Sequence, residues 1–148
     1  MIYDFHSHTS LSDGQLSPVE LISEAYSRGY QALCITDHAG IGYLPRLLQE
    51  TSQDCVLASS HWDIMAIPGL ELTHIPPGAI ATLAKLARDA GAKMVVVHGE
   101  TITENVKPGT KVTLHSACAI LMISLAISSG ERIKSTHPLA IALSGISG

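Results

Sequence analysis

The chain has 148 residues, enough for one compact domain with a buried core and too few for two ordinary domains. Hydrophobic residues make up 46% and charged residues 15%, which excludes a disordered chain, and the 4% of aromatic residues indicates an aliphatic core. The formal net charge of −4 provides no basic surface, so nucleic acid is not the expected partner.

Cysteine usage and the apolar runs bear on the compartment. The 3 cysteines are widely spaced, which is typical of free thiols in a reducing environment. The segment "MIYDFHSH" lacks the charged and apolar regions of a secretory signal. The longest apolar run, "ACAILMISLAI", is well short of the roughly 20 residues of a membrane helix. These features predict a cytoplasmic protein with no membrane segment.

The first predicted elements are a strand, a helix and a second strand. "MIYDF" is expected to form the strand. Ser17 and Pro18 are typical of a helix start, Glu20 completes a capping box, and Gly29 marks the end. The apolar run "QALCIT" that follows is typical of a strand buried on both faces.

The same order recurs farther along the chain. We expect a helix over 46–60, and an apolar strand over 63–72 that is interrupted at Pro68-Gly69. A helix follows over 79–90, and then a strand over 94–97. The inward face expected for that helix comprises Ile80, Leu83, Leu86, Ala87 and Ala90. Helices that alternate with apolar strands predict an α/β fold with a parallel sheet.

Polar side chains gather where the predicted strands end. They are His6 and His8, Asp37 and His38, Glu71, and His98, after the first to fourth strands respectively. In parallel α/β folds this rim is where catalytic groups collect. Residues at i and i+2 of an extended segment point the same way, so His6 and His8 can bind one cation. Asp13 can return to the rim through the turn at 12–14.

A metal site explains this pattern better than its alternatives do. A single histidine is more often structural than a ligand, and Asp37 could merely cap a turn. Four strand ends that all carry metal-type ligands are harder to attribute to chance. Histidine with carboxylate suits zinc, manganese or iron, and a pair of such ions can activate water and bind a phosphoryl group.

Four segments carry a family resemblance. "FHSHTSLSDG", "ITDH", "PGLELTH" and "VVVHGE" resemble the successive metal motifs of the PHP (polymerase and histidinol phosphatase) family, in its histidinol-phosphatase-like branch, over about residues 1–122. The resemblance implies one PHP-like domain over 1–148 with an α/β fold, a partial or distorted TIM-like (β/α)7 barrel. Its C-terminal third, with a tail over 123–148, is atypical.

The resemblance also implies a set of roles. The expected metal ligands are His6, His8, Asp13, His38, Glu71 and His98. His6 and His8 would bind a first ion, Glu71 would bridge to a second held by His98, and Asp13 and His38 would serve a third. The catalytic residues would be Glu71 and Asp37, with Asp37 orienting an imidazole. Two or three divalent ions (Zn, Mn or Fe) would then hydrolyse a small phosphorylated metabolite or nucleotide through metal-bound hydroxide.

Two family features are missing from the later part of the chain. A His-Pro-Gly-like segment and a late Asp-x-His pair are expected, but neither is recognisable, and no aspartate follows Asp89.

Two further residues are candidates for substrate contact. His74 either contacts substrate or is a loop residue before Pro76-Pro77, and Lys107 lies on a loop after the strand that precedes His98.

Two other functions stay open. The His-x-His pair also suits an amidohydrolase-like enzyme that cleaves C–N bonds, and the missing late ligands suit a non-catalytic metal-binding relative. An incomplete barrel would leave apolar strand surface uncovered, so a homo-oligomer is also expected.

Overall fold

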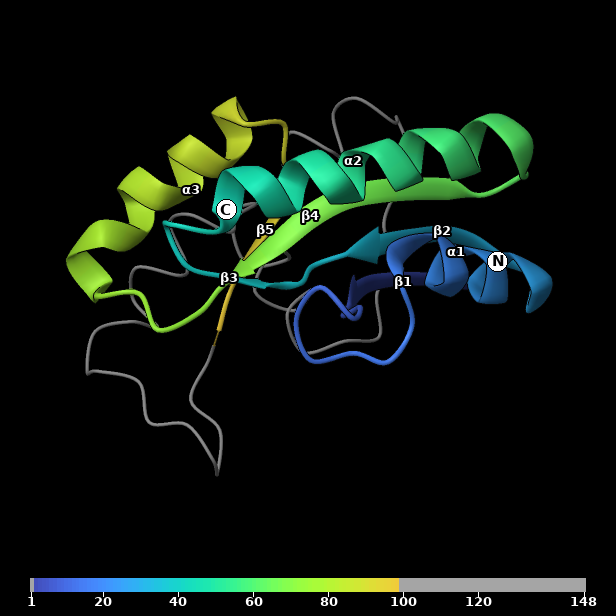
Figure 1. Ribbon diagram of the computed structural model, residues 1–148, viewed down its shortest axis with the longest axis horizontal. Coiled ribbons are helices and arrows are strands. Elements are labelled where there is room, and N and C mark those ends of the chain that lie inside the picture. The colour runs from blue at the N-terminus through green and yellow to red at the C-terminus, as the bar shows by residue number, and fades with distance from the viewer. Residues whose placement is uncertain (1, 99–148) are drawn as a thin grey trace, which may run out of the picture.

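The computed structural model describes residues 2–98, which form a mixed α/β unit (Figure 1). Its elements in chain order are β1 (Ile2–Ser7), α1 (Pro18–Ser27), β2 (Tyr30–Ile35), β3 (His38–Ala39), α2 (Leu44–His61), β4 (Met65–Leu72), the 3-10 turn η1 (Pro77–Ala79), α3 (Ile80–Asp89) and β5 (Met94–Val97). The strands and helices expected within these residues are all present, whereas the two-residue strand β3 and the turn η1 were not predicted.

Strand β4 is the centre of the sheet. Its first half pairs with β2, which in turn pairs with β1, and its second half lies between β3 and β5. All of these pairings are parallel, as the alternation of helices and strands predicted. The sheet curls into a half-barrel, with α2 packed along β4 (Figure 1). The carboxyl ends of the strands consequently share one edge.

Helix α1 begins and ends where the sequence predicted. Pro18 is its first residue, and the Ser17 N–H donates a hydrogen bond of 2.9 Å to the Glu20 carboxylate. Gly29 follows the helix with a φ of 80°, a left-handed conformation that favours glycine. The helix therefore leads directly into β2.

The predicted interruption of the strand at Pro68-Gly69 is wrong, because β4 runs through both residues. The Pro68 carbonyl accepts a 2.8 Å hydrogen bond from the Lys93 N–H, on the β5 side of the strand. Because the nitrogen and carbonyl of one strand residue lie on the same side, the missing N–H of Pro68 also lies on that side, next to where β5 begins at Met94, and it removes no hydrogen bond to β2. A side chain at position 69 would collide with Met94, whose Cβ and carbonyl oxygen would each lie 2.9 Å from the new Cβ. Glycine here allows β5 to approach.

The inward face of α3 is narrower than predicted. Ile80, Leu83 and Ala87 are buried, as expected, but Leu86 is 40% exposed and Ala90 lies beyond the helix and is exposed. At 100° per residue, Leu86 lies about 120° around the helix from Ile80, too far to reach the sheet. Only the narrower stripe packs against the strands.

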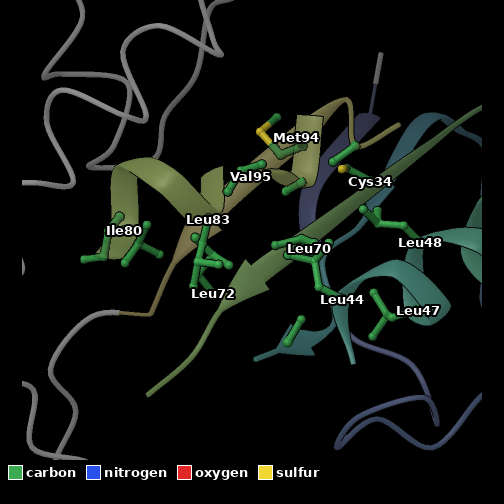
Figure 2. Packing of buried hydrophobic residues seen from close by; sticks show 14 of the residues in the cluster. Cys34, Leu44, Leu47, Leu48, Leu70, Leu72, Ile80, Leu83, Met94 and Val95 are labelled. Atoms are coloured by element: carbon green, nitrogen blue, oxygen red, sulfur yellow. The ribbon is translucent and has the colours of Figure 1, made fainter. Parts of the chain in front are cut away.

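The core is aliphatic, as the composition predicted. Leucines of α2 and β4 interleave with β5 and α3, and Figure 2 shows Leu44, Leu47, Leu48, Leu70, Leu72, Ile80, Leu83, Met94 and Val95 together with Cys34. Cys34 and Cys55 are buried free thiols, and burial raises the pKa of Cys55 to about 12. Within residues 2–98, no helix combines the length and apolarity needed to cross a membrane.

Candidate metal centre

The carboxyl edge of the sheet carries a cluster of histidine and carboxylate side chains. Its members are His6 in β1, His8 just after it, Asp13 in the following loop, His38 in β3, Glu71 in β4 and His98 directly after β5. Residues separated by more than 90 positions thus meet because parallel strands end side by side. Three overlapping groups in this cluster have ligand atoms that all lie within 4.8 Å of one another.

The first group is His6, His8 and Glu71. The two imidazoles point the same way, as their i and i+2 spacing predicted, and their rings stack with centroids 5.1 Å apart. Their Nε2 atoms are 3.0 Å apart and lie 3.6 and 3.5 Å from Glu71 Oε2. Two nitrogens that each lie about 2.0–2.1 Å from one zinc ion have a similar separation.

The second group is His8, Asp13 and His38. His8 Nδ1 is 2.9 Å from Asp13 Oδ1, and His38 Nε2 is 3.6 Å from Asp13 Oδ2. The turn expected at 12–14 makes this possible, because the Gly14 N–H donates a 2.8 Å hydrogen bond to the Thr9 carbonyl. That turn brings the exposed Asp13 carboxylate back over the imidazoles.

The third group is His38, Glu71 and His98. His38 Nδ1 is 3.0 Å from Glu71 Oε2, and the His38 and His98 rings have centroids 5.3 Å apart. His98 is positioned by its own N–H, which donates a 2.9 Å hydrogen bond to the Leu72 carbonyl at the end of β4. Glu71 therefore faces histidines from both of its neighbouring strands and from β1.

Glu71 is the electrostatic centre of the cluster. Its residue is only 4% exposed, and burial alone would raise the pKa of its carboxyl. The His6 imidazole, 3.6 Å from the carboxylate, and the charges of His38 and His98 outweigh burial, so the pKa of Glu71 is lowered. The nearby Glu71 carboxylate in turn raises the pKa of His6. A buried carboxylate surrounded by imidazoles stays charged, as a metal ligand must.

The residues present fit divalent metal ions. Each group combines imidazole nitrogen with carboxylate oxygen, the mixed donor set that zinc, manganese and iron accept. The two carboxylates supply negative charge from opposite sides of the histidines, Glu71 from the buried sheet and Asp13 from the exposed loop. The three groups contain the six residues that the family resemblance implies as ligands, and His8, His38 and Glu71 each belong to two groups.

Asp37 makes contacts other than the expected one with an imidazole. Its carboxylate is fully buried and accepts hydrogen bonds from the Thr9 N–H at 2.6 Å, the Thr9 hydroxyl at 2.7 Å and the Ser12 hydroxyl at 2.5 Å. All of these donors belong to the loop that carries Asp13. The structure thus gives Asp37 a role in holding that loop.

Of the two residues expected to contact substrate, the structure describes His74 but not Lys107. His74 is exposed, has a φ of 57°, and lines a groove together with His38. It lies outside the three ligand groups. Lys107 lies outside the described residues.

Sequence reasoning missed three residues around the cluster. The Thr73 hydroxyl is 2.7 Å from His38 Nδ1, and its position two residues after Glu71 on an extended segment was a signal that could have revealed it. Thr9 and Ser12, which hold Asp37, had no such signal, because polar residues are common in loops.

Comparison with known proteins also indicates a PHP domain. The PHP domain family model matches residues 4–120. The chain is 46% identical over 111 residues to the uncharacterized protein MJ1295 of Methanocaldococcus jannaschii, an alignment covering 74% of this chain and 51% of that protein. It is 36% identical over 75 residues to the 5'-3' exoribonuclease Rnm of Salmonella typhimurium, covering 51% of this chain and 24% of that enzyme. For Rnm of Escherichia coli the identity is 35% over 75 residues, with the same coverage of 51% and 24%.

The matches differ in how much of each protein they cover. The chain spans about half the length of the first of these relatives and about a quarter of the length of the other two. The family match is broader on this chain, since it takes in every strand-end ligand described above. The chain therefore belongs to the PHP domain family.

Proposed function

We propose that the protein is a metal-dependent phosphoesterase that hydrolyses a small phosphorylated metabolite or a nucleotide. The observation that carries the proposal is the position of Glu71, a buried carboxylate with imidazole nitrogens of His6, His8 and His38 within 3.0–3.6 Å of one of its oxygens. A phosphoester fits a cluster of ions because its phosphoryl oxygens are negatively charged. We further propose two or three ions per chain, a sheet that continues toward a distorted seven-stranded barrel, and a cytoplasmic location.

The ligand groups define what each side chain would do. Glu71 would contribute a carboxylate both to the ion held by His6 and His8 and to the ion held by His38 and His98, while Asp13 would contribute the carboxylate on the exposed side. Divalent ions bound there would supply Lewis acidity for activating water and for stabilising charge on the phosphoryl oxygens. The burial of Glu71 limits its contact with solvent, which strengthens its attraction for cations.

The end of an RNA strand is a second candidate substrate. It is favoured by the similarity over 75 residues to two enzymes named as 5'-3' exoribonucleases, whose names specify phosphodiester cleavage in RNA. The net charge of −4 opposes extended contact with a nucleic-acid backbone, so a nucleotide or a short oligonucleotide end fits this chain better than a long strand. Hydrolysis of a cyclic amide would instead favour an amidohydrolase-like enzyme.

Replacement of Glu71 by Gln tests the proposal. The variant keeps the size of the side chain but removes the charge that faces the histidines, so metal-dependent hydrolysis of phosphoesters should fall by more than about 100-fold. The measurement is hydrolysis of phosphomonoesters, phosphodiesters, short RNAs and cyclic amides by protein loaded with zinc, manganese or iron. Elemental analysis of the same samples gives the number of ions per chain.

Glu50→Gln is the matched control, because Glu50 pairs with Arg46 on α2 at 2.8 Å and lies outside the ligand groups. It should hydrolyse phosphoesters at the wild-type rate. Equal rates for wild type and Glu71→Gln would contradict the proposal. Ion binding by the wild type without turnover of any substrate would favour the non-catalytic reading.

A further inference from the structure

An open groove of about 910 Å³ lies beside the metal centre, and the proposed function does not account for it. It is bounded by the segment after β3, the segment after β4 and the start of α3. His38 and Thr73 line it where it meets the ligand cluster. A volume of this order suits an organic ligand of ordinary size, since small-molecule sites have volumes of about 300–1,000 Å³.

The lining selects for a neutral group. Ile41, Ile75, Pro76 and Leu83 provide apolar surface, and Ile41 is 64% exposed. Among the described residues that line the groove, none is Lys, Arg, Asp or Glu. An ammonium group would find no carboxylate on this lining, and a second phosphate would find no lysine or arginine, whereas a planar apolar group would replace water against it.

The groove and the metal centre share one side chain. The His38 ring contacts Glu71 at 3.0 Å and Asp13 at 3.6 Å, and the same residue lines the groove. A phosphoryl group held among the ligands would therefore carry its ester substituent to the mouth of the groove. His74, in a left-handed backbone conformation at φ 57°, adds an imidazole on which a planar ring can stack.

We propose that this groove binds the neutral, planar organic group of the substrate, of aryl or nucleobase size, while the metal centre binds the phosphoryl group. The inference rests on the proposed function and narrows its substrate class to phosphoesters of aromatic alcohols or nucleosides. Esters of small polyols would then be poor substrates.

A glycine in the lining allows a variant that blocks the groove without a steric clash at Cβ. A Cβ at Gly78, which lines the groove, would meet nothing within 4 Å, so Gly78→Trp should fill the groove without disturbing the fold. Gly42 is the matched control, because a Cβ there is also free of contacts within 4 Å and the residue is not part of the lining. Both variants should keep the wild-type unfolding midpoint and metal stoichiometry.

The test compares binding of phenylphosphonate and methylphosphonate to manganese-loaded full-length protein by calorimetry. We expect the wild type and Gly42→Trp to bind phenylphosphonate about tenfold more tightly than methylphosphonate, because the ring buries apolar area. Gly78→Trp should lose this preference and keep its affinity for methylphosphonate. Hydrolysis of phenyl phosphate relative to glycerol phosphate should change in parallel.

Each other outcome has a definite meaning. Equal binding of the two phosphonates by the wild type, or an unchanged preference in Gly78→Trp, would overturn the inference while leaving the phosphoesterase proposal intact. A phenyl preference that Gly78→Trp abolishes, without hydrolysis of any phosphoester, would support the groove and contradict the phosphoesterase. Binding of neither phosphonate would overturn both. A change in oligomeric state in Gly78→Trp with unchanged phosphonate binding would assign the groove to a second copy and overturn the inference.

Discussion

Asp37 illustrates how one residue can shape the site without contacting its ligand groups. Its buried carboxylate binds Thr9 twice and Ser12 once, and the turn between them delivers Asp13 to His8 and His38. Gly14 completes that turn at a position where a side chain would collide with the His8 carbonyl. The conformation of the loop after β1 therefore depends on the Asp37 carboxylate, which the loop covers.

Asp37→Asn should weaken this loop. An amide offers one acceptor oxygen in place of two, and a buried hydrogen bond to a charged group contributes about 1.5–3 kcal/mol, so a loss of that order in the free energy of unfolding is expected at pH 7. Urea unfolding measures it, and Asp63→Asn, at an exposed position, is the control. Wild-type stability in Asp37→Asn would show that the loop holds without the charge.

The start of α1 gives a prediction on the scale of an element. The pKa of Glu20 is lowered chiefly by the hydrogen bond from the Ser17 hydroxyl at 2.6 Å, and then by the one from the Ser17 N–H at 2.9 Å. Because the folded-state pKa is lowered, the stabilisation is present above the ordinary glutamate pKa of about 4.3 and is lost as the pH falls through the lower value. Glu20→Gln should therefore melt below the wild type at pH 7.

The two melting temperatures should converge as the pH falls through the lowered pKa of Glu20, where the wild-type carboxyl also becomes protonated. Ser17→Ala, which removes the hydroxyl donor, should show the same convergence. Thermal unfolding followed by circular dichroism across this range measures both. A difference between wild type and Glu20→Gln that is constant with pH would exclude the cap as its source.

The approach of β5 to β4 is the second prediction on this scale. In Gly69→Ala the new Cβ would lie 2.9 Å from Met94 Cβ and 3.0 Å from Cys34 Sγ, so the strands must separate. Overpacking of this kind costs about 1–3 kcal/mol. Urea unfolding should show that loss for Gly69→Ala and none for Gly78→Ala, whose Cβ is unobstructed. Equal stability of the two variants would show that β5 can shift without cost.

Exposed apolar side chains give a prediction for the whole molecule. Ile2 and Tyr3 in β1 and Met65 in β4 are 48%, 43% and 59% exposed, and within residues 2–98 β1 pairs on one side only. Apolar strand surface of this kind favours self-association. Sedimentation should show a mass that rises with concentration, and Met65→Lys should reduce the rise. A monomer at every concentration would refute the expectation.

Much of the architecture was predictable because the signals are local. Apolar runs and the cap at Ser17 predicted the strands and α1, and the family motifs predicted which side chains would lie together at the strand ends. Those side chains, including His6 and His98, do cluster as the common edge of parallel strands requires. The ion count and the catalytic roles stay predictions.

The features that could not be predicted depend on neighbours distant in sequence. Pro68 is tolerated within β4 because its missing N–H lies on the side where β5 only begins, and Leu86 is exposed because it lies outside the stripe of α3 that packs on the described strands. The Asp37 contacts depend on a loop whose path follows from packing rather than from periodicity. Such features require the assembled sheet.

Because the candidate ligands are spread along the chain, metal binding at the centre requires the folded state. Its side chains come from β1, the loop after it, β3, β4 and the end of β5, so no short segment of the chain holds a complete group. Ions with affinity for the native state alone add to its stability by mass action, about 2.7 kcal/mol when free metal exceeds the dissociation constant 100-fold. If the proposed ions bind, removal of the metal should therefore lower the stability of the folded chain and increase its susceptibility to proteases.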